Sequence, residues 1–465
     1  MTDGRFTCAY GDLPGRLDDI CRYLDTLGAG ADAVPALECI NSTAGVLTLL
    51  ALLRRGSHFL LNPGSGNVEP TDSNLKPVAR FCTHRIVVLR APPEAPPDWL
   101  ETPGNFLSVS RHADYLGPPE ACDPGIGNLY IRTSGSLGTT KIVVHGQTRL
   151  FHNADSCLDR LGLEAEDRVT LPVPIFHMYG LGAGFLPALL AGASIHVEEH
   201  GNILRYLDNE RRFQPNVAFL NPLLCGMLLR WGRFGSSYRR VVTSTQAMRE
   251  EMFRDFDDNF GNLISLYGST EMGAITASLS QQSQDKRAAG LGPPLRGVTL
   301  RLEDDNKDGA ELLCLHPYGY RGYLDEAGHW LHRCAEGEWY RSGDWARQRN
   351  DGILVILGRA NSSVNRGGYL VFLGDIENEL EKLPEISQAA VIASDEEDHR
   401  GRRLTAFCIP KQGVTTTADA LRAACFRHLP KHSIPDHIHL LSSLPLLPSG
   451  KLDRKTLLLH SKELI

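Results

Sequence analysis

Apolar and polar positions alternate along the chain in blocks that predict strands and helices in turn. LDDICRYLDTLGAG carries a helical pattern that ends at glycine, AVPALECI is typical of a buried strand, and STAGVLTLLALLRRG has the start and stop signals of a helix. The order repeats in RVTLPVPIFHMYGLGAGFLPALLAGASIHV and in NVAFLNPLLCGMLLRWG. This alternation predicts an α/β fold with doubly wound sheets.

Polar loops follow several of the predicted strands. RRVVTSTQAM and LISLYGSTEMG each contain an apolar run that ends in Ser, Thr or Glu, and a further strand leads to His177. Loops at the carboxyl ends of parallel strands meet at one edge of a sheet. We therefore expect a ligand site along that edge.

The pattern changes after about residue 285. Short strands and turns such as GAELLCLHPYGYRGYLDEAGHW predict a small antiparallel β unit packed on the α/β body. DIENELEKL, AAVIASD, RLTAFCIP, DALRAACFRHL and IHLLSSLP then predict a compact α+β unit. We predict a large N-terminal domain at residues 1–359 and a small C-terminal domain at residues 360–465, with a hinge near Ala360 and Asn361.

Composition restricts the class of protein. A length of 465 residues suits two or more domains, and a net charge of -7 argues against a general nucleic-acid or anionic-membrane binder. The longest apolar run, GVLTLLALL, is too short to span a bilayer, and the N-terminus lacks a signal-peptide pattern. Eleven scattered cysteines without CxxC pairs indicate reduced thiols, from which we predict a cytoplasmic location.

The segment IRTSGSLGTTKIVVH, residues 131–145, has the composition of an anion-binding loop. It is not a Walker loop, because Thr140 precedes Lys141 and the continuation is strand-like. We expect a hairpin tip whose glycines approach a polyphosphate closely, whose hydroxyls donate hydrogen bonds and whose lysine supplies charge. The candidate residues are Thr133, Ser134, Gly135, Ser136, Gly138 and Lys141. The alternative is a solvated Gly/Ser turn.

TSGSLGTTK resembles the phosphate loop of the AMP-forming adenylating superfamily, which includes acyl-CoA synthetases, peptide-synthetase adenylation domains and luciferases. PIFHMYGLG, YGSTE, YRSGDW, GRANSSVNRGGYLVFLGDIE and LPSGKLDR resemble the family's later motifs in the same order. The resemblance implies a luciferase-like adenylating fold with a small mobile C-terminal domain. It also implies that ATP activates a carboxylic acid to an acyl-adenylate with release of pyrophosphate, before the acyl group passes to a thiol.

The resemblance assigns roles within YGSTE. Tyr267 lies against adenine with Gly268 beside it, Thr270 contacts the α-phosphate or the acyl carboxylate, and Glu271 holds Mg²⁺. A hard cation on phosphate oxygens needs few carboxylates and several waters, which agrees with one glutamate. The alternative for Glu271 is a charge at a helix N-terminus.

Three further residues acquire roles in the same way. Asp344 matches the carboxylate that binds the ribose hydroxyls, Arg359 helps hold the nucleotide near the hinge, and Lys451 matches the catalytic lysine carried by the small domain. A long, flexible ammonium suits a role in one step only. The alternatives are a surface aspartate, an ordinary ion-paired arginine and a solvated lysine.

The chain departs from the family pattern at several positions: Leu137, Thr140, Asn361, Asn365 and Asp375. The two asparagines remove charge where the domains are expected to pivot. A member that binds nucleotide or acyl-adenylate without turnover is therefore an alternative.

The residue after Phe176 bears on the choice of acid. Amino-acid-activating relatives have an aspartate there, which pairs with the substrate ammonium, whereas this chain has His177. Without that carboxylate a free amino acid loses a desolvated ion pair. We expect an aryl or medium-length acyl acid, with His177 at the reacting group; the alternative is a structural core histidine.

The acceptor thiol is expected to come in trans, because no carrier segment follows LPSGKLDR before Ile465. CoA and a freestanding acyl carrier protein bearing phosphopantetheine are both compatible. Amino-acid activation with a displaced carboxylate and a luciferase-type oxygenase remain as other functions.

Overall fold

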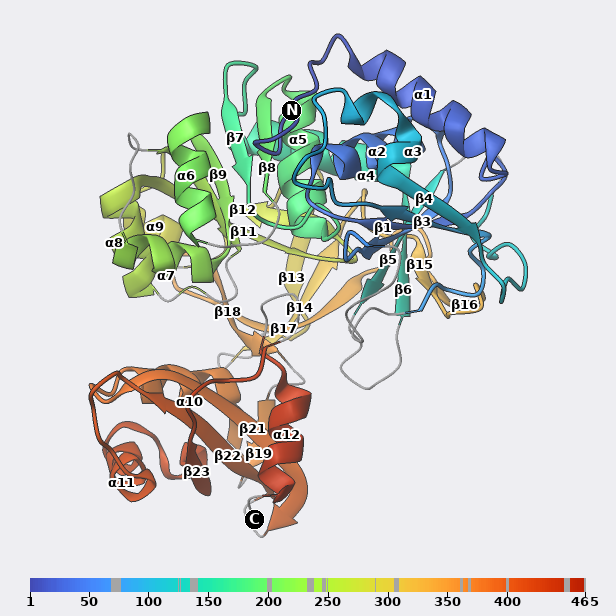
Figure 1. Ribbon diagram of the computed structural model, residues 1–465. Helices are drawn as coiled ribbons and strands as arrows, with labels where there is room; N and C mark the ends of the chain where they lie inside the picture. Colours follow the sequence, from blue (N-terminus) through green and yellow to red (C-terminus); the bar gives the residue numbers. More distant parts are fainter. Residues whose placement is uncertain are drawn as a thin grey trace. The chain divides into compact units, whose positions relative to one another are not determined.

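The computed structural model describes residues 1–67, 77–123, 125, 127–133, 141–198, 203–231, 238–244, 248, 250–288, 290–304, 309–359, 363–366, 369–398, 401–446 and 452–463. The chain forms two compact units, whose elements are labelled in Figure 1. Unit 1 comprises Met1–Leu300 and Cys314–Tyr340, and unit 2 comprises Arg301–Leu313 and Arg341–Ile465. The domain boundary between residues 359 and 360 stays a prediction.

The first sheet of unit 1 has the strand order β16-β15-β6-β5-β2-β1-β3-β4. Its strands are β1 (Pro35–Cys39), β2 (Phe59–Pro63), β3 (His84–Val88), β4 (Leu107–Arg111), β5 (Asn128–Thr133), β6 (Lys141–Gly146), β15 (Gly322–Leu324) and β16 (Trp330–Arg333). Strands β3, β1, β2 and β5 run parallel, and β4, β6, β15 and β16 add antiparallel pairs at the two ends.

The second sheet of unit 1 has the order β12-β11-β10-β9-β7-β8. Its strands are β7 (Arg168–Leu171), β8 (Ser194–Val197), β9 (Val217–Leu220), β10 (Tyr238–Ser244), β11 (Gly261–Ser269) and β12 (Gly273–Ala277). All pairs are parallel except that of β11 with β12. The loops after β7, β9, β10 and β11 therefore leave the same edge, as the sequence predicted.

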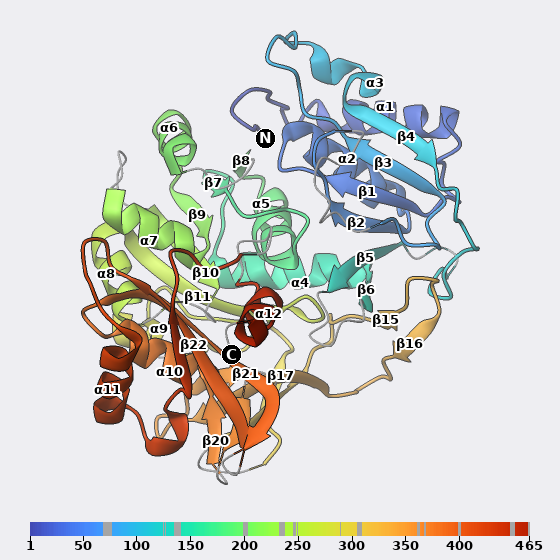
Figure 2. The same ribbon diagram turned by 60° about the horizontal axis from the view of Figure 1, so that its bottom comes forward.

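Helices separate and cover these sheets. They are α1 (Leu13–Thr26), α2 (Thr43–Arg55), η1 (Trp99–Glu101), α3 (Pro103–Phe106), α4 (Gln147–Leu161), the π-helix η2 (Tyr179–Phe185), α5 (Leu186–Leu190), α6 (Ile203–Phe213), α7 (Pro222–Trp231), α8 (Glu250–Phe260) and α9 (Gln284–Ala288). Helix α4 contacts β6 of the first sheet and β12 of the second, and it runs between them in Figure 2. It thereby connects the phosphate-loop hairpin to the turn after β11.

The longest apolar run of the sequence, GVLTLLALL, forms most of helix α2. The Ser42 side chain accepts the Gly45 N–H at its start, and Gly56 ends it with φ of 71°. Its residues from Thr43 to Leu53 are buried, and each buried leucine contributes about 1.5–3 kcal/mol. In the part of the chain that the structure describes, no helix combines the length and hydropathy needed to cross a membrane.

Unit 2 contains two sheets and packed helices. One sheet contains β13 (Thr299–Leu302), β14 (Ala310–Leu315), β17 (Tyr340–Gln348) and β18 (Leu354–Arg359). The boundaries between the two units fall within β13, β14 and β17. A second sheet contains β19 (Ser363–Arg366), β20 (Tyr369–Phe372), β21 (Ile386–Asp398), β22 (Gly401–Pro410) and β23 (His437–Leu440), and in it β23 pairs with β22 in parallel. The helices are α10 (Leu373–Glu381), α11 (Ala418–His428), η5 (Lys431–Ser433) and α12 (Arg454–Glu463). The predicted α+β character is confirmed, although α12 was not predicted.

Candidate active site

The predicted phosphate loop begins and ends on paired strands. Thr133 of β5 lies opposite Lys141 of β6, and the Thr133 hydroxyl donates to the Lys141 carbonyl oxygen at 3.3 Å. The predicted hairpin is thus confirmed at its base. Its other candidate residues, Ser134, Gly135, Ser136 and Gly138, lie outside the described residues, as do Leu137 and Thr140.

Thr270 and Glu271 lie in the tight turn between β11 and β12. His145 Nε2 donates to the Thr270 carbonyl oxygen at 2.6 Å. A Cβ atom on Gly268 would lie 2.2 Å from the Gly273 carbonyl oxygen, so this turn needs glycine at that position. The main chain of the turn is therefore fixed, while Thr270 and Glu271 are both half-exposed.

Helix α4 holds the far side of the same turn. The Asn153 side chain donates to the Ala274 carbonyl oxygen at 2.9 Å and accepts the Ala274 N–H at 3.1 Å. Tyr267, predicted to contact adenine, is only 3% exposed on β11. Its ring is therefore part of the packed sheet that supports the turn.

Tyr323 of β15 joins two of the predicted residues. Its hydroxyl donates to Glu271 Oε1 at 2.9 Å, and the Lys141 ammonium lies 5.0 Å from the centroid of its ring. Two more rings continue the cluster. The centroid of the Tyr320 ring lies 4.9 Å from that of Tyr323, and the centroid of the Tyr340 ring lies 5.6 Å from that of Tyr320. The structure therefore brings the predicted phosphate-binding lysine and the predicted metal-binding glutamate to one aromatic side chain.

The groups around Glu271 are uncharged donors at neutral pH. Burial, followed by the nearby Glu271 carboxylate, raises the pKa of the Tyr323 and Tyr340 hydroxyls. Burial lowers the pKa of His145 to about 4, although its hydrogen bond to Thr270 opposes this. Glu271 accepts the hydrogen bond of one of these hydroxyls, that of Tyr323. Its carboxylate with the Thr270 hydroxyl is an oxygen donor set that fits Mg²⁺, with water and phosphate oxygens as further ligands.

His177 lies at the same sheet edge, after β7. It is exposed, so the alternative of a core histidine is wrong, and its ring contacts Phe176 with centroids 5.0 Å apart. The Tyr179 hydroxyl donates to the carbonyl oxygens of Leu220 at 3.0 Å and Val242 at 2.8 Å. These bonds tie the His177 segment to β9 and β10.

Asp344 and Arg359 meet within unit 2. They face each other on β17 and β18, and Arg359 Nε lies 2.7 Å from Asp344 Oδ1. The Asp344 side chain is 1% exposed and that of Arg359 is 42% exposed, so the arginine covers the carboxylate that was predicted to bind ribose. Lys451, Asn361 and the side chain of Asn365 lie outside the described residues.

Sequence reasoning missed the residues that hold the candidates in place: Tyr320, Tyr323, Tyr340, His145 and Asn153. The only signal was YGYRGY, in which Tyr320 and Tyr323 stand three residues apart. Their proximity to Glu271, about fifty residues earlier, depends on the pairing of β15 with β6.

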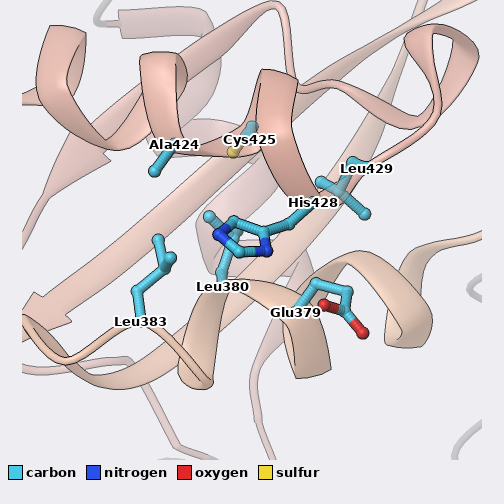
Figure 3. Close-up of a pocket in the computed structure, with 7 residues that line it drawn as sticks. All are labelled: Glu379, Leu380, Leu383, Ala424, Cys425, His428 and Leu429. Carbon is cyan, nitrogen blue, oxygen red and sulfur yellow. The ribbon is translucent and has the colours of Figure 1, made fainter.

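Two surface hollows lie elsewhere. One lies between α10 and α11, where the His428 ring lies beside Leu380 (Figure 3). The other, of about 250 Å³, is lined by Arg5, Phe6, Thr7, Cys8, Arg16, Leu47, Pro97, Leu100 and Glu101. None of the predicted site residues lines either hollow, so the candidate site rests on the side-chain contacts described above.

Comparison with known proteins matches residues 375–451 to the C-terminal domain of AMP-binding enzymes. The indoleacetate–CoA ligase of Aromatoleum aromaticum is 26% identical over 95% of this chain and 91% of its own length. The benzoate–CoA ligase of Thauera aromatica is 29% identical over 70% of this chain and 64% of its own. A dimodular nonribosomal peptide synthase of Bacillus subtilis is 26% identical over 96% of this chain, which spans 20% of that protein.

Solved structures share the fold. ATP-bound MatB from Rhodopseudomonas palustris superimposes with a TM-score of 0.77 at 20% identity, over 98% of this chain and 94% of that one. The anthranilate CoA ligase AuaEII with anthranoyl-AMP gives 0.75 at 19% identity, over 96% and 90% of the two chains. The model of the AMP-binding enzyme family itself matches residues 1–324, and the chain therefore belongs to this family.

Proposed function

We propose that this protein activates an aromatic carboxylic acid with ATP and transfers the acyl group to a thiol. The observation that carries the proposal is the contact of Lys141 and Glu271 with Tyr323, because a cation for phosphate and a carboxylate for Mg²⁺ are needed side by side. Membership of the AMP-binding enzymes supports the use of ATP.

In the first step a carboxylate oxygen attacks the α-phosphorus and the bond to pyrophosphate breaks. Lys141 and the loop before it bind the triphosphate, Thr270 donates to the α-phosphate or the acid, and Lys451 carries positive charge to the same oxygens. Glu271 and Thr270 would hold Mg²⁺, which neutralises phosphate charge when bound. In the second step the thiol sulfur attacks the acyl carbon and AMP leaves.

Asp344 with Arg359 provides the ribose contact in this proposal. A ribose hydroxyl would replace the contact that Arg359 Nε makes with Asp344 Oδ1. Tyr267 and Gly268 would support the adenine from the end of β11.

The exposed His177 favours an aryl acid over an amino acid, since it stands where a carboxylate would bind a substrate ammonium. Two of the similar proteins are named for indoleacetate and benzoate, which are aromatic carboxylates. We infer that CoA is the acceptor, with a freestanding carrier protein as the second candidate. Eleven free cysteines support the prediction of a cytoplasmic location.

Hydroxylamine trapping tests the proposal. The protein is incubated with ATP, Mg²⁺, hydroxylamine and one acid from an aryl, a fatty or an amino-acid series, and the hydroxamate is measured. Aryl acids are expected to react best, and added CoA should convert them to thioesters. Preference for an amino acid would favour ligation to a carrier protein as the function. Emission of light or uptake of oxygen that depends on the acid would indicate an oxygenase. No reaction with any acid would refute the enzyme proposal.

A further inference from the structure

The turn after β16 carries three side chains with metal-binding atoms. His332 lies on β16, Cys334 directly follows the strand, and Glu338 ends the turn. One ligand atom from each, a ring nitrogen, a sulfur and a carboxylate oxygen, lies within 4.8 Å of the others. All three residues belong to unit 1, and none is part of the candidate active site.

The local backbone keeps these side chains together. Cys334 N donates to the Arg321 carbonyl oxygen at 2.9 Å, which continues the hairpin by one residue. Gly337 adopts φ of 74° and turns the chain back, and Glu338 Oε2 accepts the Ala335 N–H at 2.7 Å. The carboxylate is thus held over the turn by its own main chain.

A surface ion pair explains only part of this arrangement. Glu338 Oε1 lies 2.8 Å from His332 Nε2, and such an exposed pair contributes about 0–1 kcal/mol. The pair does not account for the thiol beside it.

We propose that His332, Cys334 and Glu338 bind a zinc ion, with water as the fourth ligand. Thiolate with imidazole selects zinc over magnesium, whose ligands are oxygens. Zinc bonds of about 2.0–2.3 Å place two ligands of a tetrahedral ion about 3.5 Å apart, so small rotations of these solvent-accessible side chains complete the geometry. Binding replaces the thiol proton, which passes to the solvent.

The test uses the full-length protein without an affinity tag, because a histidine tag binds zinc itself. Zinc is titrated against a chromogenic chelator in excess Mg²⁺, which occupies oxygen-ligand sites. The wild type should bind one equivalent. Cys334→Ser should weaken binding about 100-fold or more, and His332→Ala and Glu338→Gln about tenfold or more. Cys122→Ser and His329→Ala, which change a half-buried thiol and an exposed imidazole elsewhere in unit 1, should bind as the wild type does.

Cobalt(II) provides a spectroscopic check of the ligands. The wild type and Cys122→Ser should show thiolate-to-cobalt charge-transfer absorption, and Cys334→Ser should lack it. Chemical unfolding without metal establishes that the variants are folded. Absence of zinc binding by the wild type, or equal binding by Cys334→Ser and the wild type, would overturn the proposal.

Discussion

Tyr323 determines how the two charges of the unit 1 site are presented. Its ring lies beside the Lys141 ammonium and its hydroxyl holds one oxygen of Glu271, so one side chain orients a cation and an anion without carrying charge itself. Preorganised charges of this kind act on a transition state without the cost of reorienting solvent.

Tyr323→Phe should therefore reduce adenylation while keeping the ring. We expect kcat/KM for ATP to fall about tenfold and the free energy of unfolding to fall by about 1 kcal/mol, the usual contribution of one hydrogen bond. Pyrophosphate exchange and urea unfolding measure the two effects. Tyr115→Phe, at an exposed tyrosine, is the control. Wild-type kinetics for Tyr323→Phe would show that this hydrogen bond does not support the site.

His145 should make the stability of the protein depend on pH. Its pKa is lowered to about 4 in the folded state, against about 6.5 in an unfolded chain, so the unfolded state binds more protons between these values. Stability should therefore be fully present above about pH 6.5 and decrease as the pH falls to 4, by an amount on the order of 3 kcal/mol. His145→Gln should show a smaller decrease in urea unfolding over this range. Parallel pH profiles for the two proteins would contradict the assignment.

The π-helix η2 holds the His177 segment through close backbone packing. A Cβ atom on Gly180 would lie 2.1 Å from the Pro174 carbonyl oxygen, which belongs to the loop before His177. Such π-helical turns occur often at functional sites.

Gly180→Ala should displace this loop. We expect the free energy of unfolding to fall by about 1–3 kcal/mol, because the clash is with main-chain atoms. The KM for the acid should rise as His177 moves. Gly15→Ala in α1, where an added Cβ meets nothing within 4 Å, should instead stabilise the protein by about 0.5–1 kcal/mol. Equal stability of both variants in chemical unfolding would show that the close contact is not limiting.

Elements with local signals could be predicted from the sequence, and those made by tertiary contacts could not. Helix α2 was predicted because Ser42 and Gly56 mark its ends. Helix α12 was missed because its stability depends on packing Leu457 against Ile392 and Phe407 of a distant hairpin. Strand β21 extends to Asp398, beyond the predicted AAVIASD, because β22 pairs with it along that length.

Across the whole molecule, the ordered motifs predicted the family and the candidate residues. They could not predict that Lys141 and Glu271 share a tyrosine, since 130 residues separate them and the contact depends on how β15 pairs with β6. Nor could they predict that Arg359 covers Asp344, which follows from the register of β17 and β18.

Lys451 is expected to serve one half-reaction only. Lys451→Ala should abolish formation of the acyl-adenylate, because the charge on the α-phosphate oxygens loses its ammonium partner. The same variant should still form the thioester when supplied with preformed acyl-adenylate and CoA. Lys411→Ala, at an exposed lysine of unit 2, is the control. Equal loss of both half-reactions would contradict this role.

Acid-dependent exchange of labelled pyrophosphate into ATP tests the central claim most directly, because it reports adenylation without any acceptor thiol. With an aryl acid and Mg²⁺, the wild type and the exposed-site control Glu94→Gln should exchange at equal rates. Glu271→Gln should exchange about 100-fold more slowly or worse while unfolding as the wild type does. If no acid supported exchange by the wild type, the account would be contradicted. An unchanged rate of exchange in Glu271→Gln would contradict it as well.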